Sequence, residues 1–244
     1  MGIEQQILHH AAAEAPLECC GLVVSTEDQP RYLPCKNIAD CPELNFEISP
    51  DDWLRAQLQG DILAVVHSHP GGPNYLSEAD RAIQKRTACE WWLASRGDLL
   101  RFRNCLPLLG RQFLHGTTDC YTLIRDAYHL AGIELPEAER EDDWWLGEQE
   151  LYLENIVSAG FSRIADDKPQ PGDVLLICLG SARANHAAIY CGDQTILHHV
   201  PHRLSRRDTY GGYWQQYTHS IWRHQAWQPS AFTAICNDMA AAFT

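Results

Sequence analysis

Residues 61–80 read DILAVVHSHPGGPNYLSEAD, and this stretch decides how the first half of the chain is organised. The apolar run at 61–67 has the length and composition of a buried strand. If the strand continues through His69, the side chains of His67 and His69 project from the same face, because side chains alternate along a strand. Two imidazoles placed in this way can converge on one metal ion.

The segment after this strand supplies a third candidate ligand. A Gly-Gly-Pro loop at 71–73 can turn the chain back, and Ser77 and Asp80 then open a helix in the order Ser-x-x-Asp. Two histidines and one carboxylate leave a coordination position for water, which is the arrangement of a catalytic zinc site. The same order also forms a capping box. Residue types alone therefore predict either a metal site or a capped helix beside two unrelated histidines.

The complete spacing resembles the JAMM (MPN+) motif of a metallopeptidase family. His-x-His, seven residues, Ser, two residues and Asp match that motif position by position. The family also carries a glutamate upstream, at the edge of an early strand. Residues 16–22, PLECCGL, place Glu18 there in a form similar to the bacterial branch of the family. The resemblance implies a JAMM/MPN-like fold and the cleavage of amide or isopeptide bonds.

The JAMM resemblance also implies a role for each of five residues. Zinc would be held by His67, His69 and Asp80. Glu18 would be the general base that takes a proton from the metal-bound water, and Ser77 would hydrogen-bond the oxyanion of the tetrahedral intermediate. The ligand types favour zinc over iron or manganese.

Cys120 is a second candidate reactive residue, because it opens the next helix. Asp119 is a favourable N-cap, so Cys120 is expected in the first helical turn. The positive end of the helix dipole favours a thiolate there and lowers the pKa of the thiol. The alternative is a buried structural thiol, which is our interpretation of the other cysteines. The chain has 10 cysteines, and no pair of them has C-x-x-C spacing.

Two histidines lie on a probable hairpin further along the chain. His186 begins a strand at 186–191, and a second strand follows at 195–199. A three-residue loop would place His186 opposite His198, whereas a two-residue loop would place it opposite His199. The register therefore decides which histidine orients His186.

A cysteine at a helix start, followed by this pair of histidines, resembles the NlpC/P60 branch of papain-like peptidases. The resemblance implies that Cys120 is the nucleophile, His186 the general base and then acid, and His198 the residue that fixes the imidazole. Family spacing selects His198 over His199. Many members have Ser-Gly after the cysteine, whereas this chain has Tyr121 and Thr122, a departure that bears on the shape of the substrate groove.

The length of 244 residues suits two domains of roughly 100–130 residues. We expect an α+β/α/β two-domain protein with a JAMM/MPN-type domain at 1–107, a papain-like NlpC/P60 domain at 108–230 and a C-terminal tail at 231–244. The acidic segment 137–150, which contains Trp144 and Trp145, is expected to be an insertion or a helical elaboration. Its aromatic residues could form an interface, although an ordinary packed helix is the alternative.

Composition excludes several partners. The formal net charge of −13 disfavours nucleic acid and anionic membranes, which both attract Lys and Arg. No run approaches the roughly 20 apolar residues of a membrane span. The first ten residues lack the apolar run of a signal peptide. We therefore expect a protein that is made in a cytoplasm and keeps its cysteines as buried thiols.

The order of the two domains, together with the segments 119–121 (DCY), 186–190 (HAAIY), 203–207 (RLSRR) and 210–214 (YGGYW), resembles tail assembly proteins of lambda-like tailed phages. This resemblance implies phage tail tip proteins as partners, and location in the host cytoplasm during assembly or in the virion tail tip. NlpC/P60 relatives cut the bond between D-glutamate and a diamino acid in peptidoglycan stem peptides, so such stems are a candidate substrate. The function expected is a two-site peptidase. The alternative is a structural assembly factor in which one or both sites are vestigial.

Overall fold

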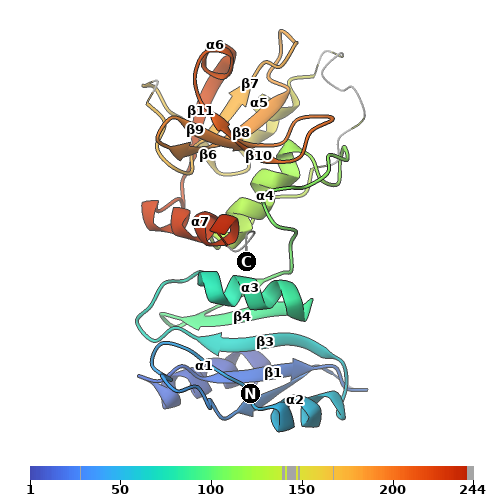
Figure 1. The fold of residues 1–244 in the computed structure, drawn as a ribbon, viewed down its shortest axis with the longest axis vertical. Coiled ribbons are helices and arrows are strands. Elements are labelled where there is room, and N and C mark those ends of the chain that lie inside the picture. The colour runs from blue at the N-terminus through green and yellow to red at the C-terminus, as the bar shows by residue number, and fades with distance from the viewer. Residues whose placement is uncertain (28, 139–140, 142–146, 148, 167, 241–244) are drawn as a thin grey trace. The chain divides into compact units, whose positions relative to one another are not determined.

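The computed structural model describes residues 1–244 except 28, 139–140, 142–146, 148, 167 and 241–244 (Figure 1). The chain divides into two compact units, Met1–Cys105 and Leu106–Thr244. Trp144 and Trp145, which we considered as an interface, lie outside the described residues. None of the helices within the described residues has the length and apolar character of a membrane span.

The first unit is built on a five-stranded sheet with the order β2-β1-β3-β4-β5. Its elements are α1 (Ile3–Glu14), β1 (Cys20–Val24), β2 (Arg31–Cys35), α2 (Pro50–Gln57), β3 (Ile62–Ser68), α3 (Glu78–Thr87), β4 (Glu90–Ser95) and β5 (Asp98–Phe102). Strands β3 and β4 are parallel, and the other neighbours are antiparallel. Because the crossover from β3 to β4 contains α3, the helix begins close to the end of β3.

Both faces of this sheet are covered, which explains why every residue of β1 is buried. Val23 faces the side on which α1 packs with Ile7, and Leu22 faces the opposite side with Ala56 of α2. Burial of such side chains is worth about 1.5–3 kcal/mol each relative to exposure. The sheet is therefore a rigid frame for the residues at the ends of its strands.

Residues 45–48 do not form a strand. Only an isolated bridge joins Asn37 to Ile48. The side chain of Asn37 instead pairs with the backbone, donating to the carbonyl of Asn45 at 2.9 Å and accepting from the N–H of Glu47 at 3.1 Å. Since these side-chain bonds satisfy groups that a strand partner would otherwise bind, the segment remains irregular.

The second unit contains a six-stranded antiparallel sheet with the order β10-β9-β8-β7-β11-β6. Its elements are α4 (Cys120–Leu130), α5 (Leu151–Ile156), β6 (Phe161–Arg163), β7 (Val174–Ile177), β8 (His186–Gly192), β9 (Thr195–His198), β10 (Arg206–Thr209), α6 (Tyr213–Gln216), β11 (Thr218–His224), η2 (Pro229–Ala231) and α7 (Phe232–Ala240). Helix α4 packs against β8. The packing brings together the two elements on which Cys120 and His186 were predicted.

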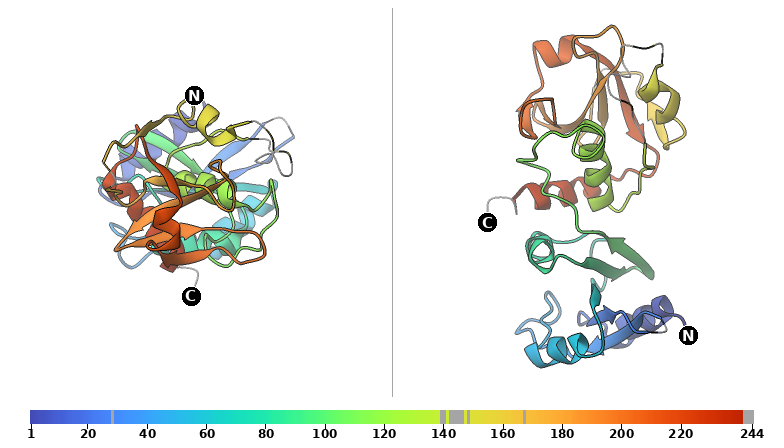
Figure 2. Two further views of the ribbon diagram at one scale, coloured as in Figure 1. Left: turned by 90° about the horizontal axis from the view of Figure 1, so that it is seen from above. Right: turned by 90° about the vertical axis from the view of Figure 1, so that its right-hand side faces the viewer.

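The segment 231–244 was expected to be a tail, but α7 occupies most of it and packs beside α4 (Figure 2). Ile235 and Asp238 are fully buried, and an Asp238 carboxylate oxygen accepts the N–H of Leu108 at 2.7 Å. The sequence pattern had not predicted this helix. The domain limits at 107 and 230 stay predictions.

The β8–β9 hairpin has neither of the two registers that we considered. Ala188 lies opposite His198, because the loop consists of Asp193 and Gln194 and a bulge interrupts β8 next to Gly192. Both loop residues have positive φ, 47° and 52°, as a type I′ turn requires. The bulge adds one residue to β8, which the sequence pattern did not reveal.

Candidate functional sites

The three predicted metal ligands of the first unit meet in a buried cluster. His67 Nε2 lies 3.2 Å from His69 Nε2 and 3.5 Å from Asp80 Oδ2, and the distance from His69 Nε2 to Asp80 Oδ2 is 3.4 Å. Ligand bonds of about 2.0–2.1 Å set the edges of a tetrahedral zinc site at about 3.3 Å. The three donor atoms therefore fit three corners of such a site.

The backbone at the end of β3 holds the two histidines on one side. The N–H of His69 donates to the carbonyl of Ala94 at 3.1 Å, so the chain stays extended beyond the last residue of β3. The loop then turns back so tightly that a Cβ on Gly72 would lie 2.9 Å from the Cβ of His69. A glycine is required at this position because any side chain would push the loop away from the cluster.

The loop also orients the ring of His69. His69 Nδ1 lies 3.0 Å from the carbonyl oxygen of Pro73, which can only accept a hydrogen bond. The Nδ1 atom therefore carries the proton, and the lone pair of Nε2 points at the cluster. Metal-bound histidines are held by such an outer hydrogen bond.

His67 is the most enclosed member of the cluster. Its ring stacks on Phe46 with a centroid distance of 4.7 Å. Burial lowers the pKa of His67, although the nearby Asp80 opposes this shift. A neutral imidazole is the form that binds a metal. The pKa of Asp80 is held below its usual range, since hydrogen bonds and charge from the histidines outweigh its burial.

Ser77 and Asp80 begin α3 and form the capping box that the sequence left as an alternative to a metal site. Ser77 Oγ accepts the N–H of Asp80 at 3.1 Å, and Asp80 Oδ2 accepts the N–H of Ser77 at 2.8 Å. Since this same Oδ2 atom faces the two histidines, the capping box orients the carboxylate toward them. The capping box and the predicted metal site are therefore formed by the same residues and do not exclude each other.

Glu18 lies at the edge of the cluster, just before β1. Glu18 Oε1 is 4.0 Å from His69 Nε2, and the residue is 6% exposed. Burial raises the pKa of Glu18 to about 7; the nearby His69 opposes this shift and Asp80 adds to it. A carboxyl group with a pKa near neutral can both accept and return a proton.

In the second unit, Cys120 is the first residue of α4. Asp119 caps the helix by accepting the N–H of Thr122 at 3.0 Å, and its other oxygen accepts the N–H of Gly116 at 2.8 Å. These bonds fix the loop that leads to Cys120. The thiol is partly exposed, and its Sγ lies 3.2 Å from the hydroxyl of Tyr152. The position combines access with the positive end of the helix dipole.

His186 and His198 lie side by side on one face of the sheet. His198 is opposite Ala188, so His186 is its diagonal neighbour, and His186 Nε2 lies 3.2 Å from His198 Nδ1. Burial and the neighbouring His198 lower the pKa of His186 to about 3. The ring of Trp214 packs edge-on against His198 with a centroid distance of 4.5 Å. His186 is therefore a neutral imidazole shielded from water.

His199 points away from this pair. Its ring packs against Phe113, with a centroid distance of 5.1 Å. Successive side chains of a strand face opposite sides. The structure therefore brings His198, and not His199, to His186.

Asp208 is a member of the histidine row that the sequence did not reveal. Its Oδ2 atom lies 3.0 Å from His198 Nε2 and accepts hydrogen bonds from Arg206 at 2.8 and 3.1 Å. Burial disfavours the carboxylate, but hydrogen bonds from Arg206 and His198 outweigh it and lower the pKa of Asp208. The pairing of β10 with β9, which places Asp208 beside His198, was the missing information.

The row of Asp208, His198 and His186 sets the position of its protons. A carboxylate only accepts, so His198 Nε2 donates to Asp208 and His198 Nδ1 must accept. His186 Nε2 then donates to His198 Nδ1. The lone pair of His186 is left on Nδ1. Such a ring can accept a proton at one defined atom.

Two family models match the chain in succession. The model described as prokaryotic homologs of the JAB domain matches residues 2–105, and the NlpC/P60 family model matches residues 110–223. These matches confirm the predicted fold class, with a JAMM/MPN-like first domain and an NlpC/P60 second domain. They do not identify an ion at the cluster of His67, His69 and Asp80, which is compatible with a metal.

Relatives of known role are similar over most of the chain. Tail tip assembly protein K of Escherichia phage lambda is 58% identical over 198 residues, which are 81% of this chain and 99% of the relative. Tail tip assembly protein K of Escherichia phage N15 is 38% identical over 226 residues, which are 90% and 93% of the two chains. A solved NlpC/P60 family protein from Bacillus cereus ATCC 10987 is 13% identical over 90% of this chain and 66% of the solved chain, with a TM-score of 0.38.

Proposed function

Because the chain belongs to the family of tail tip assembly proteins K, with a JAB-type domain followed by an NlpC/P60 domain, we propose that it is a two-site peptidase of phage tail tip assembly. The observation that carries the proposal is the hydrogen-bonded row of the buried His186 and His198 and the half-buried Asp208, on the sheet against which α4 packs. Two buried imidazoles linked to a carboxylate are not needed to hold this sheet together. Such a hydrogen-bonded row is typical of a site that transfers a proton.

In the proposed reaction of the second unit, the sulfur of Cys120 attacks the carbonyl carbon of a peptide bond. His186 Nδ1 takes the thiol proton and gives it to the leaving amine. Water then hydrolyses the thioester that remains on Cys120, which releases the acid and restores the thiol. His198 keeps His186 in the tautomer that can accept the proton, and Asp208 in turn orients His198. Trp214 keeps water from competing for the two imidazoles.

In the first unit, we propose that His67, His69 and Asp80 hold a zinc ion. A bound divalent zinc supplies Lewis acidity, which polarises a substrate carbonyl and acidifies water. Glu18 accepts a proton at its carboxylate from the attacking water and returns it to the leaving amine. Ser77 accepts a backbone N–H at its cap, which leaves its hydroxyl hydrogen available to an oxyanion.

The proposed partners are phage tail tip proteins, in keeping with the names of the two relatives as tail tip assembly proteins. The proposed location is the host cytoplasm during assembly, and the virion tail tip is a second proposed location. The substrate is a peptide bond in a tail tip protein or in a peptidoglycan stem peptide. Neither proposal involves nucleic acid, in keeping with the net charge of −13.

The proposal is tested by mass spectrometry of defined muropeptides and of purified tail tip proteins after incubation with the pure protein. We expect a new fragment that disappears with Cys120→Ala and persists with Cys236→Ala, an exposed thiol of the same unit. Loss of a separate fragment with His67→Ala assigns a substrate to the metal site. Tail assembly at the normal yield with both Cys120→Ala and His67→Ala, and no fragment from any version, contradicts the proposal and favours a structural factor.

A further inference from the structure

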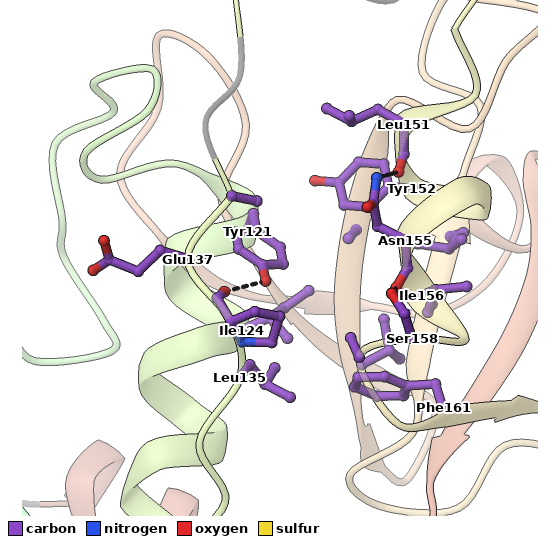
Figure 3. A pocket seen from close by; sticks show the side chains of 16 residues that line it. Tyr121, Ile124, Leu135, Glu137, Leu151, Tyr152, Asn155, Ile156, Ser158 and Phe161 are labelled. Carbon is purple, nitrogen blue, oxygen red and sulfur yellow. Dashed lines mark hydrogen bonds between the residues drawn. The ribbon is translucent and has the colours of Figure 1, made fainter.

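A pocket with a volume of about 330 Å³ opens between α4 and α5. Figure 3 shows Tyr121, Ile124 and Leu135 on one side of it and Tyr152, Ile156 and Phe161 on the other. Its floor is the sheet, through side chains of β7 and β8. The size corresponds to a site for one large side chain or a short peptide segment.

The pocket lies next to the proposed nucleophile. Tyr121, which follows Cys120 in the chain, lines it, and so does Ala187, which follows His186. Tyr152 lines it as well, and its hydroxyl lies 3.2 Å from Cys120 Sγ. A substrate bond that reaches Cys120 therefore brings an adjoining side chain to the mouth of this pocket.

The polar side chains of the pocket walls already have partners. The Tyr121 hydroxyl donates to the carbonyl of Pro136 at 2.6 Å. Asn155 Nδ2 donates to the carbonyl of Leu151 at 2.8 Å, and Ser158 Oγ donates to the carbonyl of Asn155 at 2.8 Å. Since these bonds are made within the wall, the surface offered to a ligand is mainly that of aromatic and aliphatic side chains.

The described lining of the pocket offers no cation to an acidic ligand group. Glu137 is its one charged lining residue among the described residues, and its carboxylate pairs with Arg125 at 2.9 Å. No Lys, Arg or His belongs to the described lining. A carboxylate, such as that of a D-glutamate or diamino acid residue, would lose its hydration here without gaining a cation.

We propose that this pocket binds a large apolar side chain, aromatic or branched aliphatic, of a protein substrate cleaved at Cys120. The inference rests on the proposed function and deepens it by naming the substrate class. The apolar side chain leaves water and anchors the chain. The adjoining peptide bond is thereby held at the sulfur of Cys120 and at His186. A protein segment, rather than an acidic stem peptide, is the substrate of the second unit.

The experiment uses the full-length protein and four N-acetyl dipeptidyl fluoromethyl ketones. Each probe has Phe or Asp at one of its two residue positions and Gly at the other, which gives four combinations. The preference is therefore measured whichever of the two positions reaches the pocket. The rate of alkylation of Cys120 is measured by mass spectrometry of its peptide. Iodoacetamide, which carries no side chain, reports the reactivity of the thiol itself.

We expect at least one Phe probe to alkylate Cys120 about tenfold or more faster than its Asp counterpart, the ratio that partial burial of an aromatic side chain supports. Ala159→Phe places a ring in the pocket and should remove the preference without changing the iodoacetamide rate. Val157→Phe is the matched control, because Val157 is 64% exposed and outside the lining. It should retain the preference.

Two failures are distinguishable. If Phe and Asp probes react equally while iodoacetamide still selects Cys120 over the exposed Cys41 and Cys236, the pocket proposal is wrong and the proposed nucleophile stands. If iodoacetamide shows no preference for Cys120, the proposed function fails. The pocket is then measured in Cys120→Ala by the binding of N-acetyl-phenylalaninamide. Binding that Ala159→Phe abolishes supports the pocket, and the absence of binding overturns it.

Discussion

The two sites of this chain both combine buried histidines with a carboxylate, but they are assembled in different ways. In the first unit, three of the four charged or ligating side chains come from residues 61–80, and only Glu18 comes from elsewhere. In the second unit, Cys120, His186, His198 and Asp208 come from four elements, α4, β8, β9 and β10. The first site is set by a strand end and a helix start, whereas the second depends on the register of a sheet.

The carboxylates differ in what they do. Asp80 faces two histidine nitrogens at 3.4 and 3.5 Å, so all three atoms point at a common centre. Asp208 reaches only one histidine nitrogen, and His198 stands between it and His186. A convergent group suits a cation, and a linear row suits the transfer of a proton.

The largest expected effect separates the two sites. Cys120→Ala should lower the cleavage rate of the second-unit substrate by about 1,000-fold or more, because it removes the sulfur proposed to form the acyl intermediate. Metal content should not change. Initial rates and elemental analysis of the same preparation test this, with Cys236→Ala as the control. A residual rate close to that of the unaltered protein would show that Cys120 is not the nucleophile.

The next effect concerns the convergent cluster. Asp80→Asn should weaken zinc binding by more than about 100-fold, since removal of a ligand costs at least as much as loss of an outer-shell partner. The measurement is zinc content after dialysis against a series of chelator concentrations. Glu78→Gln, in the same helical turn but exposed, should retain the metal. Equal zinc retention by both variants would remove Asp80 from the ligand set.

A smaller effect is expected at the outer end of the histidine row. Asp208→Ala should lower kcat by about 10–100-fold with little change in KM, because it removes the partner that fixes the tautomer of His198. The pH profile of kcat should also shift, which a purely structural defect would not produce. Arg207→Ala is the control, since Arg207 lies on the same strand and bonds to Thr195. A change in KM alone would argue against a positioning role.

The smallest effect is a dependence of stability on pH. Because the pKa of buried His186 is lowered to about 3, the unfolded chain binds a proton below its ordinary value of about 6.5 and the native chain does not. Native stability should therefore fall as the pH drops below that value. From pH 7 to 5.5 this residue should contribute a loss of about 1 kcal/mol.

Urea denaturation at pH 7 and 5.5 measures this loss. His186→Gln should show a smaller decrease in stability than the unaltered protein over this range. His219→Gln, at an exposed histidine of the same unit, should behave like the unaltered protein. An equal loss in all three proteins would mean that His186 is not buried in its neutral form.

The same contrast explains what could be predicted from the sequence. Short-range patterns sufficed for His67, His69 and Asp80, and for Cys120 behind its N-cap Asp119, because a strand end or helix start fixes side chains within a few residues. The choice of His198 came from family spacing and not from register. Because of the bulge in β8, the observed pairing of β8 with β9 differs from both predicted registers. Asp208 was missed because nothing local marks the strand with which β9 pairs.

The proposed substrate pocket could not be predicted from the sequence. The sequence signalled only that Tyr121 departs from the residue common after the cysteine. Which other side chains face Tyr121 depends on α5 and on the packing of α4 against the sheet. Contacts of this kind between distant elements produce no periodic pattern of residues that sequence analysis could detect.

The most direct test of the account is a comparison of tail tips assembled with the unaltered protein and with Cys120→Ala. New amino termini in the tail tip proteins are to be quantified by mass spectrometry. The account predicts at least one terminus, created beside a large apolar residue, that is present with the unaltered protein and absent with Cys120→Ala. Identical termini in both preparations, with tails of normal yield and infectivity, would contradict the claim that Cys120 processes a tail tip protein.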